Sequence, residues 1–154
     1  MPARVAYCER VAAKLQGDLG LAVPIDVEAA AAGLSLRLVV KRRMSAEALL
    51  ALTEKTIYVN GSAPMNRRRF SVAHEIGHYV LDHERERLDR YEEETQSGSK
   101  VWEAEANYFA SALLMPKTEL TADRKAGLGF DALLSKYIVS REALTIRLSN
   151  LKLL

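Results

Sequence analysis

The sequence predicts an α+β fold that is mostly helical, with a small antiparallel three-stranded sheet and a C-terminal helix-turn-helix-like hairpin. Three observations indicate this fold class. Apolar residues recur at intervals of three and four over most of the chain, which is the spacing of one helix face. They alternate with other residues only between positions 34 and 60, where strands are expected. After Pro116, helix start and stop signals divide the chain into short segments.

The composition indicates one substantial hydrophobic core. Hydrophobic residues make up 49% of the 154 positions, and the formal net charge of +2 does not single out a nucleic-acid binder. The single cysteine, Cys8, excludes an intrachain disulfide and is typical of the reducing cytoplasm, where we expect this protein. The first residues lack the apolar stretch of a signal peptide, and no run of about 18 apolar residues predicts a membrane span.

Two helices are expected before the sheet. The first spans residues 3–19, where apolar residues recur at helical spacing, and Gly20 follows its end. The second begins after Asp26, a good N-cap residue, and ends at Gly33. We interpret both as scaffold, and Cys8 as a small core residue, because no histidine lies near it in the sequence.

Three strands are expected next. They are Leu34–Lys41, Leu49–Thr53 and Thr56–Asn60. The last two form a hairpin about Glu54 and Lys55, although this turn lacks the glycine that tight hairpins favour. Glu47–Leu50 could instead be helical, because alanine and leucine favour helices.

A His-Glu-x-x-His pattern follows, on an expected amphipathic helix. The apolar face of this helix comprises Phe70, Ala73, Gly77, Val80 and Leu81. His74 and His78 lie about 40° apart around the helix axis, so both imidazoles can reach one metal ion. Glu75 lies about 60° from His78 on the other side, where it can contact a water molecule beside that ion. Gly77 costs the helix about 1 kcal/mol relative to alanine, which indicates that another backbone passes close by.

A third protein ligand is needed, and its best source is an expected helix over residues 102–116. The apolar face of this second helix comprises Trp102, Ala106, Phe109, Ala110 and Leu113. Glu103 can supply a carboxylate oxygen to the metal. Asn107, one turn later, can hydrogen-bond one of the two histidines and fix its ring. Glu105 points to the opposite side of the helix, where we expect it to be solvated.

Three neighbouring features have less specific interpretations. His83 is about 180° from His74 on a continuing helix, so we expect a structural role at the helix end; metal binding would need a sharp turn after Val80. Residues 67–69, all arginine, are interpreted as a solvated face, or alternatively as a basic patch that steers an acidic substrate segment. Residues 84–100 are strongly charged and are expected to be either disordered or a lid.

Residues 117–154 are expected to form a helical extension packed on a core of residues 1–116. The expected helices are Thr118–Ala126, Phe130–Tyr137 and Ser140–Leu151. The last two resemble a helix-turn-helix, in which Arg141, Thr145 and Arg147 would lie on the surface that enters a DNA groove. We favour a packing hairpin, because basic residues are few and the net charge is low. The residues expected to pack inward are Ala143, Leu144 and Leu148.

Three segments of the sequence together resemble a known family. They are RRRFSVAHEIGHYVLDH, the preceding IYVN, and the later E-x-E-A-N-x-F-A-x-x-L-L-M-P. These motifs are similar to those of the ImmA/IrrE family of zinc-dependent metallo-endopeptidases, and the similarity extends over nearly the whole chain. The resemblance implies a zincin-like pair of active-site helices, in which His74, His78 and Glu103 hold the metal. It implies that Glu75 is the general base.

The same resemblance implies a substrate and a place for it to bind. The substrate would be a helix-turn-helix transcriptional repressor that is cut once. The strand ending in Asn60 would edge the active cleft, where an extended substrate segment could add through main-chain hydrogen bonds.

The leading hypothesis is therefore a metal-dependent endopeptidase that hydrolyses a peptide bond in a protein substrate. Zinc is the expected cofactor, although two histidines and one carboxylate also accept manganese or iron. An alternative is a DNA- or protein-binding regulator with a vestigial or regulatory metal site. A purely structural metal site ranks lowest, because structural zinc normally has four protein ligands.

Overall fold

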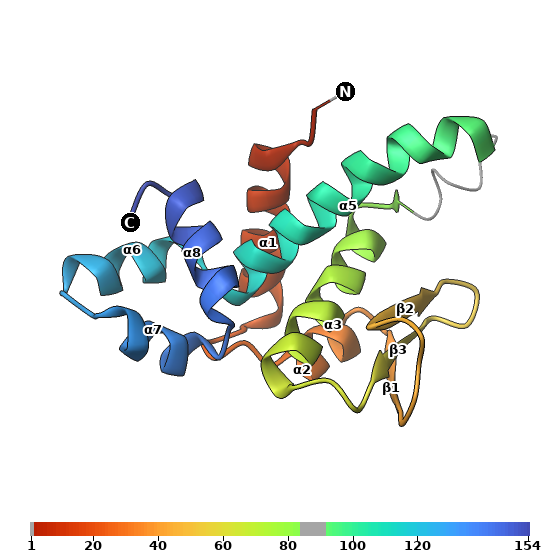
Figure 1. The fold of residues 1–154 in the computed structure, drawn as a ribbon, viewed down its shortest axis with the longest axis horizontal. Coiled ribbons are helices and arrows are strands. Elements are labelled where there is room, and N and C mark those ends of the chain that lie inside the picture. The colour runs from red at the N-terminus through yellow and green to blue at the C-terminus, as the bar shows by residue number, and fades with distance from the viewer. Residues whose placement is uncertain (1, 84–91) are drawn as a thin grey trace.

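The computed structural model describes residues 2–83 and 92–154, and only the backbone of residues 92–99. Its elements are α1 (Val5–Leu19), α2 (Val27–Gly33), β1 (Arg37–Lys41), β2 (Ala48–Ala51), β3 (Thr56–Asn60), α3 (Met65–Val80), α5 (Glu92–Leu114), α6 (Lys117–Lys125), α7 (Phe130–Tyr137) and α8 (Arg141–Asn150). The predicted α+β, mostly helical fold is confirmed. The sheet lies on one side of α3, and α6, α7 and α8 lie on the opposite side (Figure 1).

Local signals set the ends of the first elements. Gly20 ends α1 in the left-handed region, with φ of 61°. Asp26 caps α2 as predicted, because its Oδ1 accepts hydrogen bonds of 3.0 Å from the backbone N–H groups of Glu28 and Ala29. The first strand begins only at Arg37, later than predicted, because the backbone turns at Ser35, where φ is 60°.

The sheet is mixed rather than antiparallel throughout. Its strand order is β1-β3-β2, in which β3 runs antiparallel to β2 and parallel to β1. Each strand runs opposite to the one before it in the chain. All neighbours would therefore be antiparallel only if the strands lay in the order β1-β2-β3. Instead, β1 joins the β2–β3 hairpin on the side of β3, and β1 and β3 run in the same direction. The hairpin itself is confirmed, and the helical alternative for residues 47–50 is wrong, because Ala48–Ala51 is a strand.

The strand that ends in Asn60 is therefore the central strand and not an edge. Thr56, Ile57 and Val59 on it are at most 2% exposed, as expected for a strand paired on both sides. The prediction that this strand edges the cleft is wrong, and the edge strands are β1 and β2.

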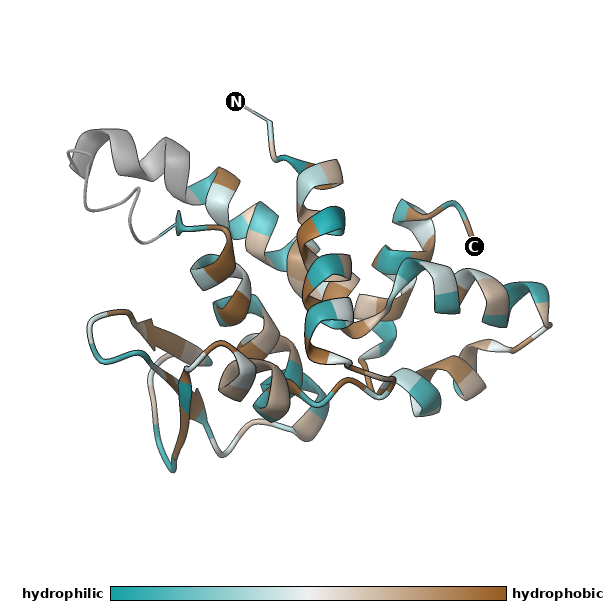
Figure 2. Ribbon diagram, turned by 180° about the vertical axis from the view of Figure 1, so that it is seen from behind, coloured by the Kyte–Doolittle hydropathy of each residue, from teal (hydrophilic) through white to brown (hydrophobic). Residues whose placement is uncertain are grey.

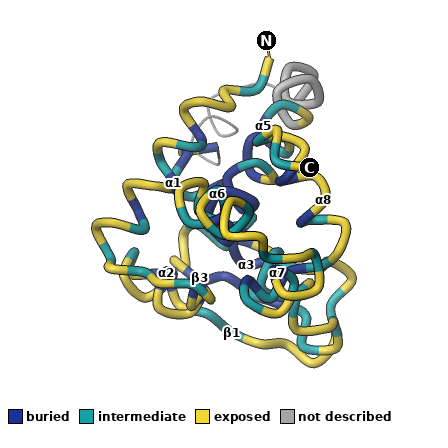
Figure 3. Tube along the Cα trace, turned by 90° about the vertical axis from the view of Figure 1, so that its left-hand side faces the viewer, coloured by how far each residue is buried: buried dark blue, intermediate teal, exposed yellow. Residues whose placement is uncertain are grey.

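Helices α3 and α5 form the buried centre of the molecule. Hydrophobic residues line the inward faces of the helices (Figure 2), and the buried turns gather along α3 and α5 (Figure 3). The two helices pack closely at Gly77, as predicted. A Cβ atom built there would lie 3.0 Å from Cδ1 of Phe109 and 3.3 Å from Cα of Ala106. Cys8 on α1 is fully buried, in agreement with its interpretation as a core residue.

We expect Gly77→Ala to lower the free energy of unfolding by about 1–3 kcal/mol, because the added methyl group overpacks the contact between α3 and α5. Gly17→Ala is the matched control. Gly17 lies within α1 with no atom within 4 Å of a built Cβ, so this variant should gain up to about 1 kcal/mol from helix propensity. Urea denaturation of both variants measures the difference, and a gain in stability for both would contradict the close approach at Gly77.

Helix α5 begins earlier than expected. Residues 92–100 were expected to be disordered or part of a lid, but Glu92–Leu114 is one helix. Residues 84–91, the remainder of that expectation, lie outside the described residues. In the part of the chain that the structure describes, none of the helices is both long and apolar enough to cross a membrane.

A buried ion pair joins α8 to α1. The guanidinium of Arg147, which is fully buried, donates hydrogen bonds of 2.8 Å to both carboxylate oxygens of Glu9 and of 3.0 Å to the carbonyl of Met115. The prediction that Arg147 lies on the surface is therefore wrong. Leu144 and Leu148 pack inward as predicted.

Candidate metal centre

Three potential metal ligands converge between α3 and α5. Nε2 of His74 and Nε2 of His78 each lie 2.9 Å from a carboxylate oxygen of Glu103, and the two nitrogens are 3.1 Å apart. The candidate ligand atoms of these residues all lie within 4.8 Å of one another. Two imidazole nitrogens and one carboxylate oxygen are a donor set that fits zinc, and also manganese or iron. The three residues could therefore hold a metal ion.

The helices position these ligands through simple geometry. His74 and His78 are one turn apart on α3, on the side that faces α5. Glu103 lies on α5, about one turn before the point where Ala106 packs against Gly77. The close helix packing thus brings the carboxylate of Glu103 within reach of both rings.

Asn107 makes the contact with His74 that its position predicted. Its Oδ1 lies 2.8 Å from Nδ1 of His74. This contact requires Nδ1 to carry a proton and donate it, so in the neutral ring Nε2 carries the lone pair that a metal ion would take. Asn107 therefore selects the tautomer of His74 that can bind a metal through Nε2.

His83 makes the corresponding contact with His78. The chain turns sharply at Asp82, where φ is 63°, although no glycine is present; aspartate tolerates this conformation better than most residues. His83 is fully buried, with its Nδ1 2.9 Å from Nδ1 of His78, and its ring stacks on Trp102 with centroids 5.7 Å apart. If His78 donates from Nδ1, its Nε2 is free to bind a metal. His83 thus lies behind a candidate ligand and is not a member of the ligand group.

Glu105 completes a chain of contacts that the sequence did not reveal. It is 1% exposed rather than solvated as predicted, and its Oε1 accepts a hydrogen bond of 2.9 Å from Nε2 of His83. The backbone N–H and the guanidinium of Arg4 donate hydrogen bonds of 2.8–2.9 Å to the same carboxylate. Hydrogen bonds from Arg4 lower the pKa of Glu105 to about 2, so this buried carboxylate is ionised at neutral pH.

We expect Glu105→Gln to weaken zinc binding by about 10- to 100-fold, because a neutral amide holds His83 and His78 in their donating tautomers less strongly than the carboxylate does. Zinc affinity is measured by competition with a coloured chelator. Glu28→Gln, a change at an exposed residue of α2, should leave the affinity unchanged. Equal affinities for the wild type and both variants would show that this chain of contacts does not support the ligand.

The electrostatics of the three candidate ligands are coupled. Hydrogen bonds from His74 and His78 hold the pKa of Glu103 far below its ordinary value. Burial alone would lower the pKa of His74, but the hydrogen bond and charge of Glu103 raise it above its ordinary value. The ionised carboxylate of Glu103 thus favours a positive charge beside the two imidazole rings, which is where a metal cation would lie.

Glu75 is half-buried and lines a hollow beside the candidate ligands. A hollow of about 300 Å³ is lined by Glu47, Ala48, Phe70, Ser71, His74, Glu75, Glu103 and Asn107. Glu75 thus shares a solvent-accessible space with two of the candidate ligands, His74 and Glu103. The hollow also reaches β2, since Ala48 is part of its wall.

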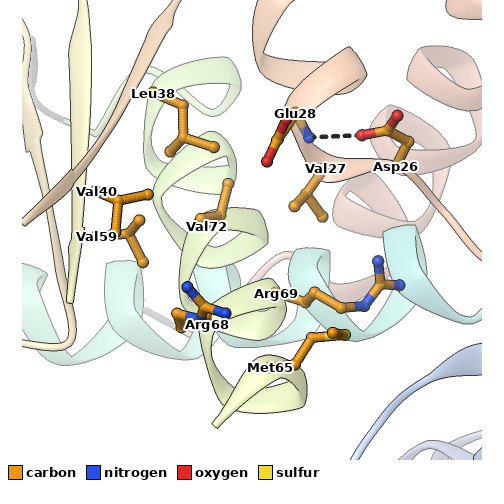
Figure 4. A pocket seen from close by; sticks show the side chains of 10 residues that line it. All are labelled: Asp26, Val27, Glu28, Leu38, Val40, Val59, Met65, Arg68, Arg69 and Val72. Carbon is orange, nitrogen blue, oxygen red and sulfur yellow. Dashed lines mark hydrogen bonds between the residues drawn. The ribbon is translucent and has the colours of Figure 1, made fainter. Parts of the chain in front are cut away.

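A different hollow lies on the opposite face of α3 (Figure 4). It is lined by apolar residues of α2, α3 and the sheet, together with Arg68 and Arg69. Arg69 donates hydrogen bonds to the carbonyls of Ile25, Tyr137 and Ile138, so the prediction of a solvated arginine face does not hold for this residue.

The chain was compared with known proteins. The family model Peptidase_M78, described as the IrrE N-terminal-like domain, matches residues 33–149. No curated protein matches the chain. A solved structure of a Mycobacterium tuberculosis transcriptional regulator is similar with a TM-score of 0.76 and 19% identity over 94% of this chain.

That match covers 46% of the regulator, so this chain spans less than half of the regulator's length. At 19% identity the likeness shows the fold alone. The family model, in contrast, covers most of the chain and all of the candidate site residues. The chain therefore belongs to the family of the IrrE N-terminal-like domain, the ImmA/IrrE family of metallopeptidases whose motifs it carries.

Proposed function

We propose that this chain is a zinc-dependent endopeptidase in which His74, His78 and Glu103 hold the metal and Glu75 is the general base. The observation that carries this proposal is the convergence of the three donor atoms within 4.8 Å, with Glu75 opening into the same hollow. Three protein ligands are typical of catalytic zinc, because a further position remains for water or substrate. Manganese or iron would suit the same donor set.

Different residues of the chain have different roles in the proposed hydrolysis. Zinc, when bound, supplies a Lewis acid that makes water acidic enough to lose a proton near neutral pH. Glu75 accepts that proton and later returns it to the leaving amine nitrogen. Asn107 and His83 hold the rings of His74 and His78 in the required tautomers.

The outer edge of β2, which pairs with no other strand among the described residues, offers a place for an extended substrate. The backbone N–H of Asn60 donates to the carbonyl of Glu47 at 2.9 Å, which fixes the alternation of hydrogen bonds along the β2–β3 pair. The N–H and C=O groups of Ala48 and Leu50 consequently point away from β3. A substrate segment that pairs with these groups would pass the hollow that contains Glu75.

The proposed substrate is a helix-turn-helix transcriptional repressor. This proposal follows from membership of the family, and the similar solved structure is itself named as a transcriptional regulator. The alternative is a DNA- or protein-binding regulator with a vestigial or regulatory metal site. Its DNA-binding form is weakened because Arg147 is buried and cannot contact DNA. The proposed organisation of the chain is a core of residues 1–116 and an extension of residues 117–154. Pro116, which lies between α5 and α6, supports this division.

The proposed function predicts metal-dependent cleavage. The zinc-loaded protein is incubated with the helix-turn-helix repressor encoded nearest to its gene, and the products are identified by intact mass spectrometry. We expect one cut, which a zinc chelator abolishes and added zinc restores. A repressor that stays intact, or that is cut equally in the presence of chelator, would count against the proposal. Salt-dependent binding to duplex DNA that Arg141→Ala abolishes would favour the regulator instead.

A further inference from the structure

A larger hollow adjoins the candidate metal centre. Its volume is about 690 Å³, and it lies between the first turns of α3, the C-terminal half of α5 and the corner that joins α7 to α8. Phe70 and Asn107 line both this hollow and the one that contains Glu75. The two spaces are therefore neighbours with a shared wall. We call the larger one the hairpin groove, because Val139, Ala143 and Ile146 of the C-terminal hairpin form its far side.

The hairpin groove has the surface chemistry of a side-chain binding site. Phe70 contributes an apolar wall from α3, and Val139 and Ile146 contribute apolar walls from the hairpin. Ile146 is 50% exposed, which leaves apolar surface for a ligand to cover. Arg67 and Glu142 lie at the same groove and provide charges of both signs. This mixture of apolar walls and a few polar groups is typical of ligand sites.

Ser111 supplies a second, independent observation. It lines the groove from α5, one turn after Asn107, and its side chain is only 6% exposed. Its hydroxyl has no hydrogen-bond partner among the described residues. A buried hydroxyl without a partner is unfavourable, so a polar group that entered the groove beside it and formed a hydrogen bond would recover this lost energy.

We propose that the hairpin groove is a substrate subsite that takes a large apolar side chain of the peptide close to the cleaved bond, while Ser111 hydrogen-bonds the peptide backbone. This proposal rests on the proposed peptidase function, because the groove gains its meaning from the neighbouring metal centre. It also assigns a role to α7 and α8: the helix-turn-helix-like hairpin is a wall of the substrate site.

The proposal is tested with synthetic peptides that have blocked ends and are identical except at one position, which carries each amino acid in turn. Binding is measured by calorimetry to the zinc-loaded Glu75→Gln variant, and cleavage is measured separately with the wild-type residue at position 75. We expect peptides with leucine, methionine or phenylalanine at one position to bind about tenfold or more tightly than those with glycine or aspartate.

Ile146→Glu, made in the Glu75→Gln background, should abolish this preference, because it places a charge on the apolar wall. Met65→Glu is the matched control. Met65 is 60% exposed, so it too is an exposed apolar residue, but it lines the hollow on the opposite face of α3 (Figure 4). The control should keep the preference. Loss of the preference in both variants, or in neither, would overturn the proposal, as would the absence of any preference in their common background.

Ser111→Ala tests the hydroxyl separately. It should weaken peptide binding several-fold while leaving the melting temperature equal or higher, because the unpaired hydroxyl is removed from the buried floor. Unchanged binding would show that Ser111 does not contact the peptide. If the wild type cuts neither these peptides nor the repressor, but the apolar preference in binding is present and is lost in Ile146→Glu, the proposed peptidase function fails, and the groove stands only as a binding site for an apolar side chain of a peptide.

Discussion

Glu75→Gln is expected to lower the rate of repressor cleavage by about 10²- to 10⁴-fold, which is the usual contribution of a general base. Glutamine preserves the size of the side chain but cannot accept the proton. The ligand group His74, His78 and Glu103 is untouched, so the variant should keep its zinc. The measurement is kcat/KM for cleavage, with zinc content determined by mass spectrometry on the same preparation.

Glu119→Gln serves as the control for this prediction. Glu119 lies on α6, where it pairs with Lys136 at 3.1 Å, away from the metal centre. It should show wild-type kcat/KM and zinc content. A Glu75→Gln variant that keeps its zinc and cuts the repressor at the wild-type rate would remove Glu75 from the mechanism.

Glu9→Gln is expected to lower the free energy of unfolding by about 3–5 kcal/mol, the typical cost of leaving a buried charge without its partner. Arg147 is fully buried, and Glu9 accepts hydrogen bonds from both its Nη1 and Nη2. The matched control is Asp18→Asn on the same helix, which removes an exposed pair with Lys14 and should cost less than about 1 kcal/mol. Urea denaturation at neutral pH measures both.

The pH dependence of this stabilisation has a defined sign. Burial opposes the ionisation of Glu9, but the hydrogen bonds and charge of Arg147 outweigh it, so the pKa of Glu9 lies below its ordinary value. The contribution of Glu9 is therefore complete above the unfolded-state pKa of about 4.3 and is lost as the pH falls through the folded-state pKa. The stability gap between wild type and Glu9→Gln should narrow in acid. A gap that widens in acid would show that Glu9 is not held in its charged form.

Local patterns in the sequence predicted most of the helices and the side chains that converge between α3 and α5. His74 and His78 lie one turn apart on a helix whose apolar face is evident, and Gly77 indicated the close approach of a second helix. Glu103 and Asn107 followed from the same reasoning applied to α5. Each of these inferences depends on spacing within one element, which helix geometry fixes.

What the sequence could not reveal depends on partners that are distant along the chain. Glu105 was expected to be solvated, but Arg4, 101 residues earlier, makes it a buried anion. Arg147 was expected at the surface, but it is buried in an ion pair with Glu9, which lies 138 residues earlier in the chain. The role of His83 required a turn at Asp82 that has no glycine to indicate it. Tertiary contacts determine the burial of Glu105 and Arg147 and the position of His83, and the local spacing of residues does not reveal such contacts.

The sheet was mispredicted for a related reason. The alternation of residues gave the strands, but strand order depends on which edge of the hairpin β1 joins, and this is a choice between tertiary contacts. This order affects the functional interpretation, because the edge strand beside the candidate metal centre is β2 and not β3.

The most direct measurement is anomalous diffraction from a crystal of the zinc-loaded protein, recorded on both sides of the zinc absorption edge. We expect one strong peak between Nε2 of His74, Nε2 of His78 and the carboxylate of Glu103, at distances of about 2.0–2.2 Å from each. A peak at some other place in the molecule, or none between these three side chains at saturating zinc, would contradict the assignment of the metal centre and the peptidase function that rests on it.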